Sequence, residues 1–395
     1  MAMSTDVLVV GGGIIGLAIA REAARAGLSV HLLERGQPGG EASGASAGML
    51  AAQFEAESPG PLLSLCLASR ALYADLLPAI QSESGVDPGL QQGGALLIAR
   101  DPVAAERLER SYTFQRAAGL EVARLAREEV IDLEPALAAS RWEIALRLPH
   151  DVSLDTTQLL RGLYLAALRA GAQVRTGAPA ERLLVRNGRV VGAQAGSERF
   201  TAGAVVVAAG AWSGAVGGEG IPLLPTHPVR GQIVCLDPPA PIARHILMTG
   251  SCYLVPRRDG RILTGSTMER VGFDKRVTAS GIATLSSAAI DLVPALAQAS
   301  FHSAWAGLRP ATADDRPAIG HGPLPGLLYA CGHLRNGIVL APITARIIVK
   351  LLRGEEPGMD LAPFSPLRFA PEGGGRPSVS GLPGPSSPAG PGNRS

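Results

Sequence analysis

Three glycines near the N-terminus have the spacing of a phosphate-binding turn. Gly11, Gly13 and Gly16 form the pattern G-x-G-x-x-G, directly after the apolar run of residues 6–10 and at the start of a helical pattern. The first glycine allows a tight turn, the second lets the backbone approach a pyrophosphate, and the third allows close packing of helix on strand. The N–H groups at the start of the helix would then face the phosphates. A glycine-rich turn without a ligand is the alternative.

An acidic residue completes this pattern. Glu34 lies eighteen residues after Gly16, at the end of a second apolar run, residues 30–33. A carboxylate at this place can accept hydrogen bonds from ribose hydroxyls, and it would repel a 2′-phosphate, which disfavours NADP. Strand, helix, second strand and acid together predict a dinucleotide site. The glycine pattern alone does not distinguish NAD from FAD.

The elements that must position this turn belong to an α/β protein. Residues 17–26 have helical spacing and are followed by Gly27, so residues 6–33 read as a strand–helix–strand unit. The apolar runs at 205–208 and 327–330 are typical of further parallel strands that are covered on both faces.

Two hairpins indicate antiparallel structure in the segments between these strands. Asn187-Gly188 and Asp259-Gly260 are strong hairpin turn signals, and each is flanked by apolar segments. We expect one of the two hairpins to belong to a second lobe. The fold class that follows is α/β: a Rossmann-type cofactor domain with a second lobe built on a mixed, largely antiparallel sheet.

Two later helices are also marked. Asp155 or Thr156 is expected to cap a helix over residues 157–170. Near the C-terminus, Pro342 suits a first helical position, and residues 343–352 form an apolar helical pattern. From residue 371 onward the chain consists mainly of Gly, Pro and Ser, which predicts a disordered tail.

The composition excludes several classes of protein. The 395 residues are 46% hydrophobic and 18% charged with a formal net charge of +2, and aromatic residues make up only 4%. Neither a basic patch nor base-stacking aromatics are evident, so nucleic acid is not expected as a partner. The N-terminus lacks the pattern of a signal peptide, and apolar stretches are interrupted before they reach a membrane-spanning length. We therefore expect a cytoplasmic enzyme with no membrane partner.

The cysteines favour a reducing compartment. They are far apart in the sequence and form no C-x-x-C pair, so neither a disulfide framework nor a metal site is expected. The four are Cys66, Cys235, Cys252 and Cys331.

Five motifs along the chain have a specific order and spacing, although no single one of them is decisive. They are VVGGGIIG at 9–16, GASAGML at 44–50, CYLVPR at 252–257, WAGLRP at 305–310 and GHLRNGIVLAP at 332–342. Through these motifs, and over residues 6 to 364, the chain resembles the glycine oxidases of thiamine biosynthesis, in the superfamily of D-amino acid oxidase and sarcosine oxidase.

The resemblance implies FAD as the cofactor and assigns residues to it. Glu34 and Arg35 would contact the adenosine side, a small-residue loop would line the flavin path, Ala180 would contact the cofactor through its backbone, and residues 333–339 would wrap the isoalloxazine ring. The loop residues are Ala42, Ser43, Ala47, Gly48 and Met49. The remaining expected contacts are Gly11, Gly13, Ile14, Ile15, Gly16, Gly210, His333, Leu334, Arg335, Asn336, Gly337, Ile338 and Val339.

A physical argument that is independent of the resemblance also favours cofactor contact by the segment before Pro342. A glycine-containing loop that leads into a helix aims N–H groups at nearby electron-rich atoms, and a reduced flavin carries negative charge near N1 and O2. The plain alternative is a packing or capping His333 followed by an ordinary turn at Asn336-Gly337.

The substrate residues come from the resemblance. An arginine at a strand end is usually a solvated rim residue, but the superfamily binds the substrate carboxylate with the residue that matches Arg309. Tyr253 would donate its hydroxyl to the same carboxylate, Met268 would close the pocket, and Arg335 would be a second pocket arginine. Otherwise Tyr253 reads as a half-buried strand aromatic and Met268 as core filling.

Two departures from the family pattern carry consequences. Sarcosine oxidases tether the flavin through a cysteine just after the stretch that matches residues 308–310, but residues 311–315 here contain no cysteine. Non-covalent FAD is therefore expected. Two residues before Tyr253, Ser251 stands where a related glycine oxidase has histidine, which leaves the preference between glycine and N-methylated amines open.

The implied activity is oxidation of glycine and other small amines to an oxo acid, ammonia and hydrogen peroxide, with a functional link to thiazole synthase and a possible homo-oligomer. The alternatives are a sarcosine or D-amino acid oxidase or dehydrogenase, a flavin-dependent tRNA-modifying oxidase, and a non-catalytic nucleotide-binding module. We expect a discontinuous FAD domain and a substrate domain. The FAD domain comprises residues 1–85, 148–222 and 304–365, and the substrate domain comprises 86–147 and 223–303.

Overall fold

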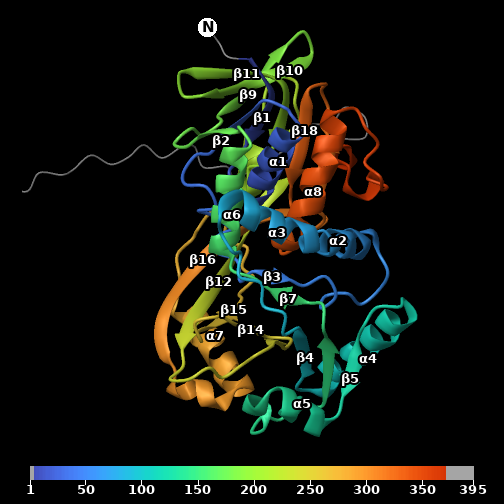
Figure 1. The fold of residues 1–395 in the computed structure, drawn as a ribbon, viewed down its shortest axis with the longest axis vertical. Helices are drawn as coiled ribbons and strands as arrows, with labels where there is room; N and C mark the ends of the chain where they lie inside the picture. Colours follow the sequence, from blue (N-terminus) through green and yellow to red (C-terminus); the bar gives the residue numbers. More distant parts are fainter. Residues whose placement is uncertain (1–3, 371–395) are drawn as a thin grey trace, which may run out of the picture.

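The computed structural model describes residues 4–370, and the tail expected from residue 371 lies outside them. Two large sheets form two lobes, with the helices α2 and α3 between them (Figure 1). The helices are α1 (Ile14–Arg25), α2 (Pro61–Ala71), α3 (Tyr73–Ser84), α4 (Pro102–Ala117), α5 (Arg127–Leu133), α6 (Thr156–Arg169), α7 (Ala279–Leu292) and α8 (Gly337–Leu352).

The first sheet confirms the Rossmann-type domain. Its strands run in the order β17-β18-β11-β1-β2-β8, and β9 and β10 extend it from β11. The pairs of β1 with β11 and β2, β11 with β18, and β2 with β8 are all parallel. The strands are β1 (Ser4–Val10), β2 (Val30–Leu33), β8 (Gln173–Arg175), β9 (Arg182–Arg186), β10 (Arg189–Ala195), β11 (Glu198–Val207), β17 (Ala318–His321) and β18 (Leu327–Cys331).

Burial on both faces explains the apolar run of β1. Val7 and Val9 pack into the cluster that contains α1, α6 and α8, while Leu8 and Val10 pack against β9 and β10 on the opposite face. A strand covered on both sides has no polar face, so its sequence does not alternate.

The second sheet is mixed and largely antiparallel, as expected. Its order is β16-β12-β15-β14-β13-β4-β6-β5, and only the pair β13–β4 is parallel. The strands are β4 (Ala95–Ala99), β5 (Ala123–Leu125), β6 (Ile144–Leu148), β12 (Thr226–Asp237), β13 (Ile246–Met248), β14 (Tyr253–Pro256), β15 (Ile262–Gly265) and β16 (Ser300–Thr312), and a small separate sheet pairs β3 (Met49–Leu50) with β7 (Val152–Ser153).

The long strands β12 and β16 run from the second lobe toward the first (Figure 1). β12 begins at Thr226, close to the expected domain boundary at 222–223, whereas the boundary expected at 304 falls inside β16. Since the two lobes share these strands, the exact domain limits remain a prediction.

The turn and cap signals are confirmed where they can be checked. Asn187 and Gly188 both have positive φ angles, 51° and 71°, in the turn between β9 and β10. The Asp155 side chain accepts the N–H of Gln158 and caps α6, and Gly171 follows that helix with a φ of 98°.

The expected start of the last helix was wrong. α8 begins at Gly337, so Pro342 lies inside the helix rather than at its first position. A proline there has no N–H, and its ring crowds the carbonyl four residues earlier, that of Ile338. The Tyr73 hydroxyl donates to this carbonyl, while the Ser69 hydroxyl donates to Val339 O at 2.5 Å. Neighbouring helices thus supply the hydrogen bonds that proline removes, which the local sequence does not show.

Replacing Tyr73 with phenylalanine should therefore destabilise the protein by about 1–3 kcal/mol, because it leaves the buried Ile338 carbonyl unsatisfied. Urea unfolding of the purified variant measures this loss. Tyr164→Phe, at a partly buried tyrosine of α6, is the matched control, and an equal change in both variants would contradict the argument.

Among the described residues, no single helix combines the length and hydropathy needed to cross a bilayer, and only α2 with α3, bent by 43°, passes that test as a pair.

Candidate active site

A single continuous cavity of about 1130 Å³ connects the two lobes. The residues that follow four neighbouring parallel strands line it: Gly11 after β1, Glu34 after β2, Ala208 after β11 and His333 after β18. Ligands of open α/β sheets bind at these carboxyl ends. The cavity then continues to Tyr253 of β14 and to the segment of β16 around Arg309.

The glycine turn has the geometry that its spacing predicts. Gly11 has a φ of 109°, which suits glycine, and no acidic residue lies in the first turn of α1. Gly13 lines the cavity, whereas Gly16 does not. A Cβ on Gly16 would collide with the Gly11 carbonyl oxygen. Gly16 therefore keeps the helix close to the turn, and Gly13 leaves room for the ligand.

Glu34 is nearly buried and holds the same turn. Its two oxygens accept the N–H groups of Gly12 and Gly36, both at 2.7 Å. The neighbouring Arg35 pairs with Glu41 and lies over the ring of Trp212, 3.4 Å from the ring centroid. A carboxylate oxygen has a second lone pair, so Glu34 can still accept from a ribose hydroxyl.

The small-residue loop lines the middle of the cavity. Ser43 accepts the N–H of Ile14 at 3.0 Å, and the Trp305 indole donates to Ala45 O at 3.0 Å, so α1 and β16 hold the loop from two sides. Of the residues expected to contact the cofactor here, only Gly48 does not line the cavity. Gly48 has a φ of 80°, and a Cβ there would collide with the Leu154 carbonyl, so its role is close backbone packing.

A second helix N-terminus faces the cavity. Residues 333–339 line it, α8 begins at Gly337, and its first turn carries no acidic residue. Because α8 starts five residues earlier than expected, the N–H groups of its first turn belong to the very residues predicted to wrap the ring. Leu334 N donates to Pro310 O at 2.8 Å, which ties this loop to β16.

His333 contributes no charge to this end of the cavity. It is 3% exposed, its Nε2 lies 3.0 Å from the Thr344 hydroxyl, and burial lowers its pKa to about 3. The imidazole is therefore neutral near pH 7, whereas the backbone N–H groups at the start of α8 contribute positive potential here.

These features fit a dinucleotide. One cavity contains a glycine turn, a carboxylate next to that turn and the N-termini of α1 and α8. Neither helix has an acidic residue in its first turn. The cofactor-binding residues expected from the sequence line this cavity, with the exceptions of Gly16 and Gly48. Those that do are Gly11, Gly13, Ile14, Ile15, Glu34, Arg35, Ala42, Ser43, Ala47, Met49, Ala180, Gly210, His333, Leu334, Arg335, Asn336, Gly337, Ile338 and Val339.

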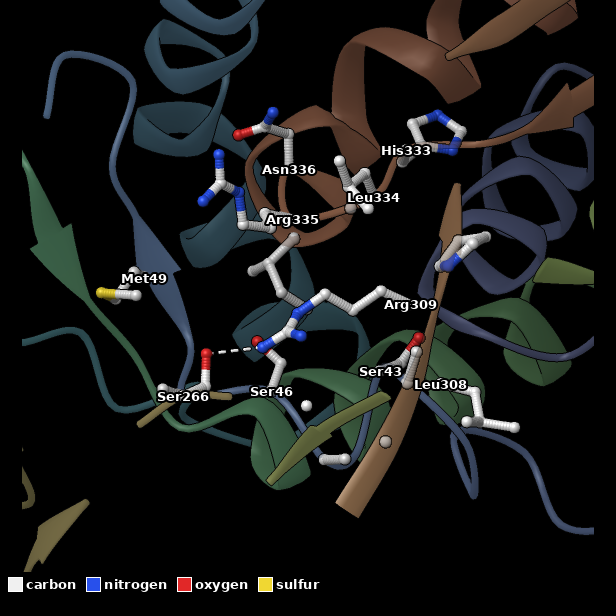
Figure 2. Close-up of a pocket in the computed structure, with 18 of the residues that line it drawn as sticks. Ser43, Ser46, Met49, Ser266, Leu308, Arg309, His333, Leu334, Arg335 and Asn336 are labelled. Carbon is white, nitrogen blue, oxygen red and sulfur yellow. Dashed lines mark hydrogen bonds between the residues drawn. The ribbon is translucent and has the colours of Figure 1, made fainter. Parts of the chain in front are cut away.

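Arg309 extends from β16 into the far half of the cavity, as Figure 2 shows. One guanidinium nitrogen, Nη2, donates to the Ser266 hydroxyl at 2.5 Å, and Nη1 donates to Thr267 O at 3.0 Å. The guanidinium lies against Gly231 of β12, where any Cβ would overlap it. Burial lowers the pKa of Arg309 from its ordinary value, but an arginine at neutral pH stays charged.

Tyr253 lies beside this arginine. Its ring packs on Gly265 of β15, where a Cβ would collide with the hydroxyl. Burial raises the pKa of Tyr253, while the charge of Arg309 opposes the shift. Tyr253 therefore remains a neutral donor next to a fixed cation, and the two can hold one carboxylate between them.

The other two expected pocket residues also reach the cavity. Met268 is half-exposed, with Sδ 3.4 Å from Arg309 Nη1, and Arg335 reaches the cavity from the loop before α8 (Figure 2). Arg335 pairs with Glu55 at 2.9 Å. Glu55 was not predicted from the sequence, and neither were Gly231 and Ser266. None of the three lies in a spacing pattern, because each gains its place through a contact between distant segments.

The fold and cavity define a dinucleotide-binding α/β protein whose cavity also contains an arginine that can hold a carboxylate. The FAD dependent oxidoreductase family model (DAO) matches residues 6–351, and the chain belongs to this family. FAD is accordingly its cofactor.

The relatives narrow the class. The chain is 38% identical over 365 residues to the glycine oxidase of Geobacillus kaustophilus, covering 91% of this chain and 96% of that protein. The crystal structure of that glycine oxidase superposes with a TM-score of 0.89 and covers 93% of this chain and 100% of that one. The chain is also 37% identical to the bifunctional protein ThiO/ThiG of Synechocystis. The match covers 93% of this chain but only 55% of the bifunctional protein.

We expect the FAD to be bound without a covalent link. Cys252 and Cys331 line the cavity, but burial raises the pKa of both thiols, that of Cys331 to about 12. Protonated thiols are poor nucleophiles. Acid precipitation of the purified protein should leave a yellow supernatant above a colourless pellet, and a yellow pellet would refute the prediction.

Proposed function

We propose that this protein oxidises glycine and other small amines, such as sarcosine and small D-amino acids, to the corresponding oxo acid, ammonia and hydrogen peroxide. The observation that carries the proposal is the pair of the partly buried Arg309 and the buried Tyr253, which lies in the same cavity as the dinucleotide cradle. The likeness to glycine oxidases over nearly the whole chain supports it.

The residues of the chain orient the substrate. The guanidinium of Arg309 and the hydroxyl of Tyr253 hold the carboxylate, while the Ser266 and Thr267 contacts keep the guanidinium in place. Fixing the carboxylate leaves Cα and the amine to face the flavin part of the cradle, so that an encounter between two molecules becomes a step with defined geometry. Met268 covers the pocket and limits the size of the substrate.

The glycine turn, Glu34 and the start of α8 would hold FAD, which would supply the redox chemistry for a two-electron oxidation of the amine with dioxygen as the final electron acceptor and hydrogen peroxide as the second product. Water then hydrolyses the imine product, so that glycine, dioxygen and water yield glyoxylate, ammonia and hydrogen peroxide. The backbone N–H groups at the start of α8 would stabilise negative charge that develops on the reduced ring.

A role in thiamine biosynthesis follows from the relatives that unite a ThiO part and a ThiG part in one chain. In this role the glycine imine would be the product that thiazole synthase receives. A cytoplasmic location and a homo-oligomer remain predictions.

The experiment that tests the proposal is anaerobic titration of the yellow protein with glycine, sarcosine and D-alanine. Bleaching of the flavin absorbance by glycine, followed by peroxide formation when air is admitted, is the expected result. Bleaching only by sarcosine or D-alanine would favour a sarcosine or D-amino acid oxidase. Both activities are alternatives because Ser251 replaces a histidine of a related glycine oxidase. Bleaching without peroxide would indicate a dehydrogenase, and no bleaching by any of the three would refute the proposal.

A further inference from the structure

The loop between β3 and α2 carries a carboxylate into the substrate half of the cavity. Glu55 lines the cavity together with Tyr253, Arg309 and Arg335, and its side chain is 32% exposed. It pairs with Arg335 Nη1 at 2.9 Å. Glu55 is therefore an anionic group in the same cavity as the residues proposed to hold the substrate carboxylate.

A buried carboxylate below the loop fixes the backbone that carries Glu55. Asp151 is fully buried and accepts three successive N–H groups, those of Ala52 at 3.1 Å, Gln53 at 3.0 Å and Phe54 at 2.9 Å. It also accepts Arg70 Nη1 at 2.5 Å. Three hydrogen bonds to consecutive residues leave the backbone little freedom, so the next residue, Glu55, is placed before a ligand arrives.

The charge of Glu55 is coupled to the substrate site. Burial raises the pKa of Glu55, and the guanidinium groups of Arg335, Arg309 and Arg107 oppose that rise. Glu55 in turn opposes the lowering of the pKa of Arg309 by burial. A carboxylate that burial destabilises gains from any further cation that enters the cavity.

An amino acid that binds in this cavity brings a positively charged ammonium group, which needs an anionic partner. With its carboxylate on Arg309, the ammonium group is two bonds from the carboxyl carbon and enters a pocket that already contains two guanidinium groups, Arg309 and Arg335. A hydroxy acid of the same size brings no such charge. Four other acids that line the cavity have different partners: Glu34 the glycine turn, Glu41 Arg35, Glu57 Arg107 and Asp101 the N-terminus of α4. A fifth, Glu181, follows Ala180 and directly precedes β9 of the first sheet, so it belongs to the cofactor domain.

We propose that Glu55 is the counter-ion of the substrate's amine, and that it makes the site select amino acids over hydroxy acids that carry the same carboxylate. The inference rests on the proposed function and extends it to a residue that the glycine, tyrosine and arginine motifs do not include. Before the substrate arrives, Arg335 holds Glu55 in place, and the arriving ammonium becomes its second cationic partner.

The test compares glycine with glycolate, which differ only in the group on Cα. Dissociation constants for the holoenzyme are measured anaerobically, from the concentration dependence of rapid flavin reduction by glycine and from the absorbance change or competition caused by glycolate. The wild type should prefer glycine by about 10- to 100-fold, the range of a charge-assisted hydrogen bond. Glu55→Gln should reduce this ratio to about twofold, mainly by weakening glycine.

The matched control is Glu57→Gln, two residues along the same loop, where the half-exposed carboxylate pairs with Arg107 at 3.2 Å. This variant should keep the wild-type ratio. A Glu55→Gln enzyme that keeps the preference for glycine would overturn the proposal. So would equal weakening of both ligands, because Glu55 would then act only through Arg335. Failure of the wild type to reduce its flavin with glycine would instead refute the proposed function.

Discussion

Replacing Arg309 with alanine is expected to raise KM for glycine by roughly 30- to 5000-fold, the equivalent of about 2–5 kcal/mol, with a much smaller change in kcat. The guanidinium lies partly buried in the cavity and is fixed by Ser266 and Thr267, so it contributes a charge and two parallel donors without reorganisation. Steady-state kinetics with peroxide detection measure the effect. Unchanged glycine kinetics would remove Arg309 from the site.

Two further variants separate the effect of the Arg309 charge on KM from the effect of the position of its guanidinium. Arg309→Lys keeps the charge but loses the planar fork, so it should recover only part of the lost affinity. Gly231→Ala keeps the arginine but places a methyl group where the guanidinium lies, so it should also raise KM. If Gly231→Ala behaved like the wild type, the position of the guanidinium against β12 would not be the one that binds substrate.

The second large effect is expected for Gly16→Ala. The added Cβ would overlap the carbonyl oxygen of Gly11, so α1 must move away from the turn that receives the pyrophosphate. Overpacking of this kind costs about 1–3 kcal/mol or more, and FAD affinity should fall at least about tenfold. The protein should purify largely colourless, and titration of the apoprotein with FAD measures the loss.

The matched control is Gly36→Ala in the same domain. A Cβ at that residue would have its nearest neighbour, Glu34 Oε1, at 3.7 Å, an ordinary contact distance. This variant should retain FAD with near-normal affinity. If Gly16→Ala bound FAD as tightly as the control, the close approach of helix and turn would not be needed for the cofactor.

Local patterns explain most of the correct predictions. A strand covered on both faces, such as β1, must be apolar throughout, and a turn with two positive φ angles, as at Asn187-Gly188, requires residues that tolerate them. The cofactor turn is similar, because Gly11, Gly13 and Gly16 act within one short segment. Arg309 and Tyr253 could be assigned only through the family resemblance, since an arginine at a strand end is usually exposed.

Other features depend on contacts between segments that are far apart in the sequence. Pro342 looked like a helix start, but α8 continues through it because Tyr73 and Ser69 supply hydrogen bonds from α3 and α2. Glu55 has no recognisable spacing to Arg335, which lies 280 residues later, and its loop is fixed by Asp151.

The sequence by itself therefore determined the cofactor turn, the two-lobed α/β architecture and, through the family motifs, the class of reaction. Only the tertiary structure decided where α8 begins, how Gly231 and Ser266 hold the guanidinium of Arg309, and which carboxylate pairs with Arg335. The physical reason is that backbone conformation and apolar periodicity are local properties of the chain. A charged group buried in a cavity, by contrast, acquires its function from partners that folding brings to it.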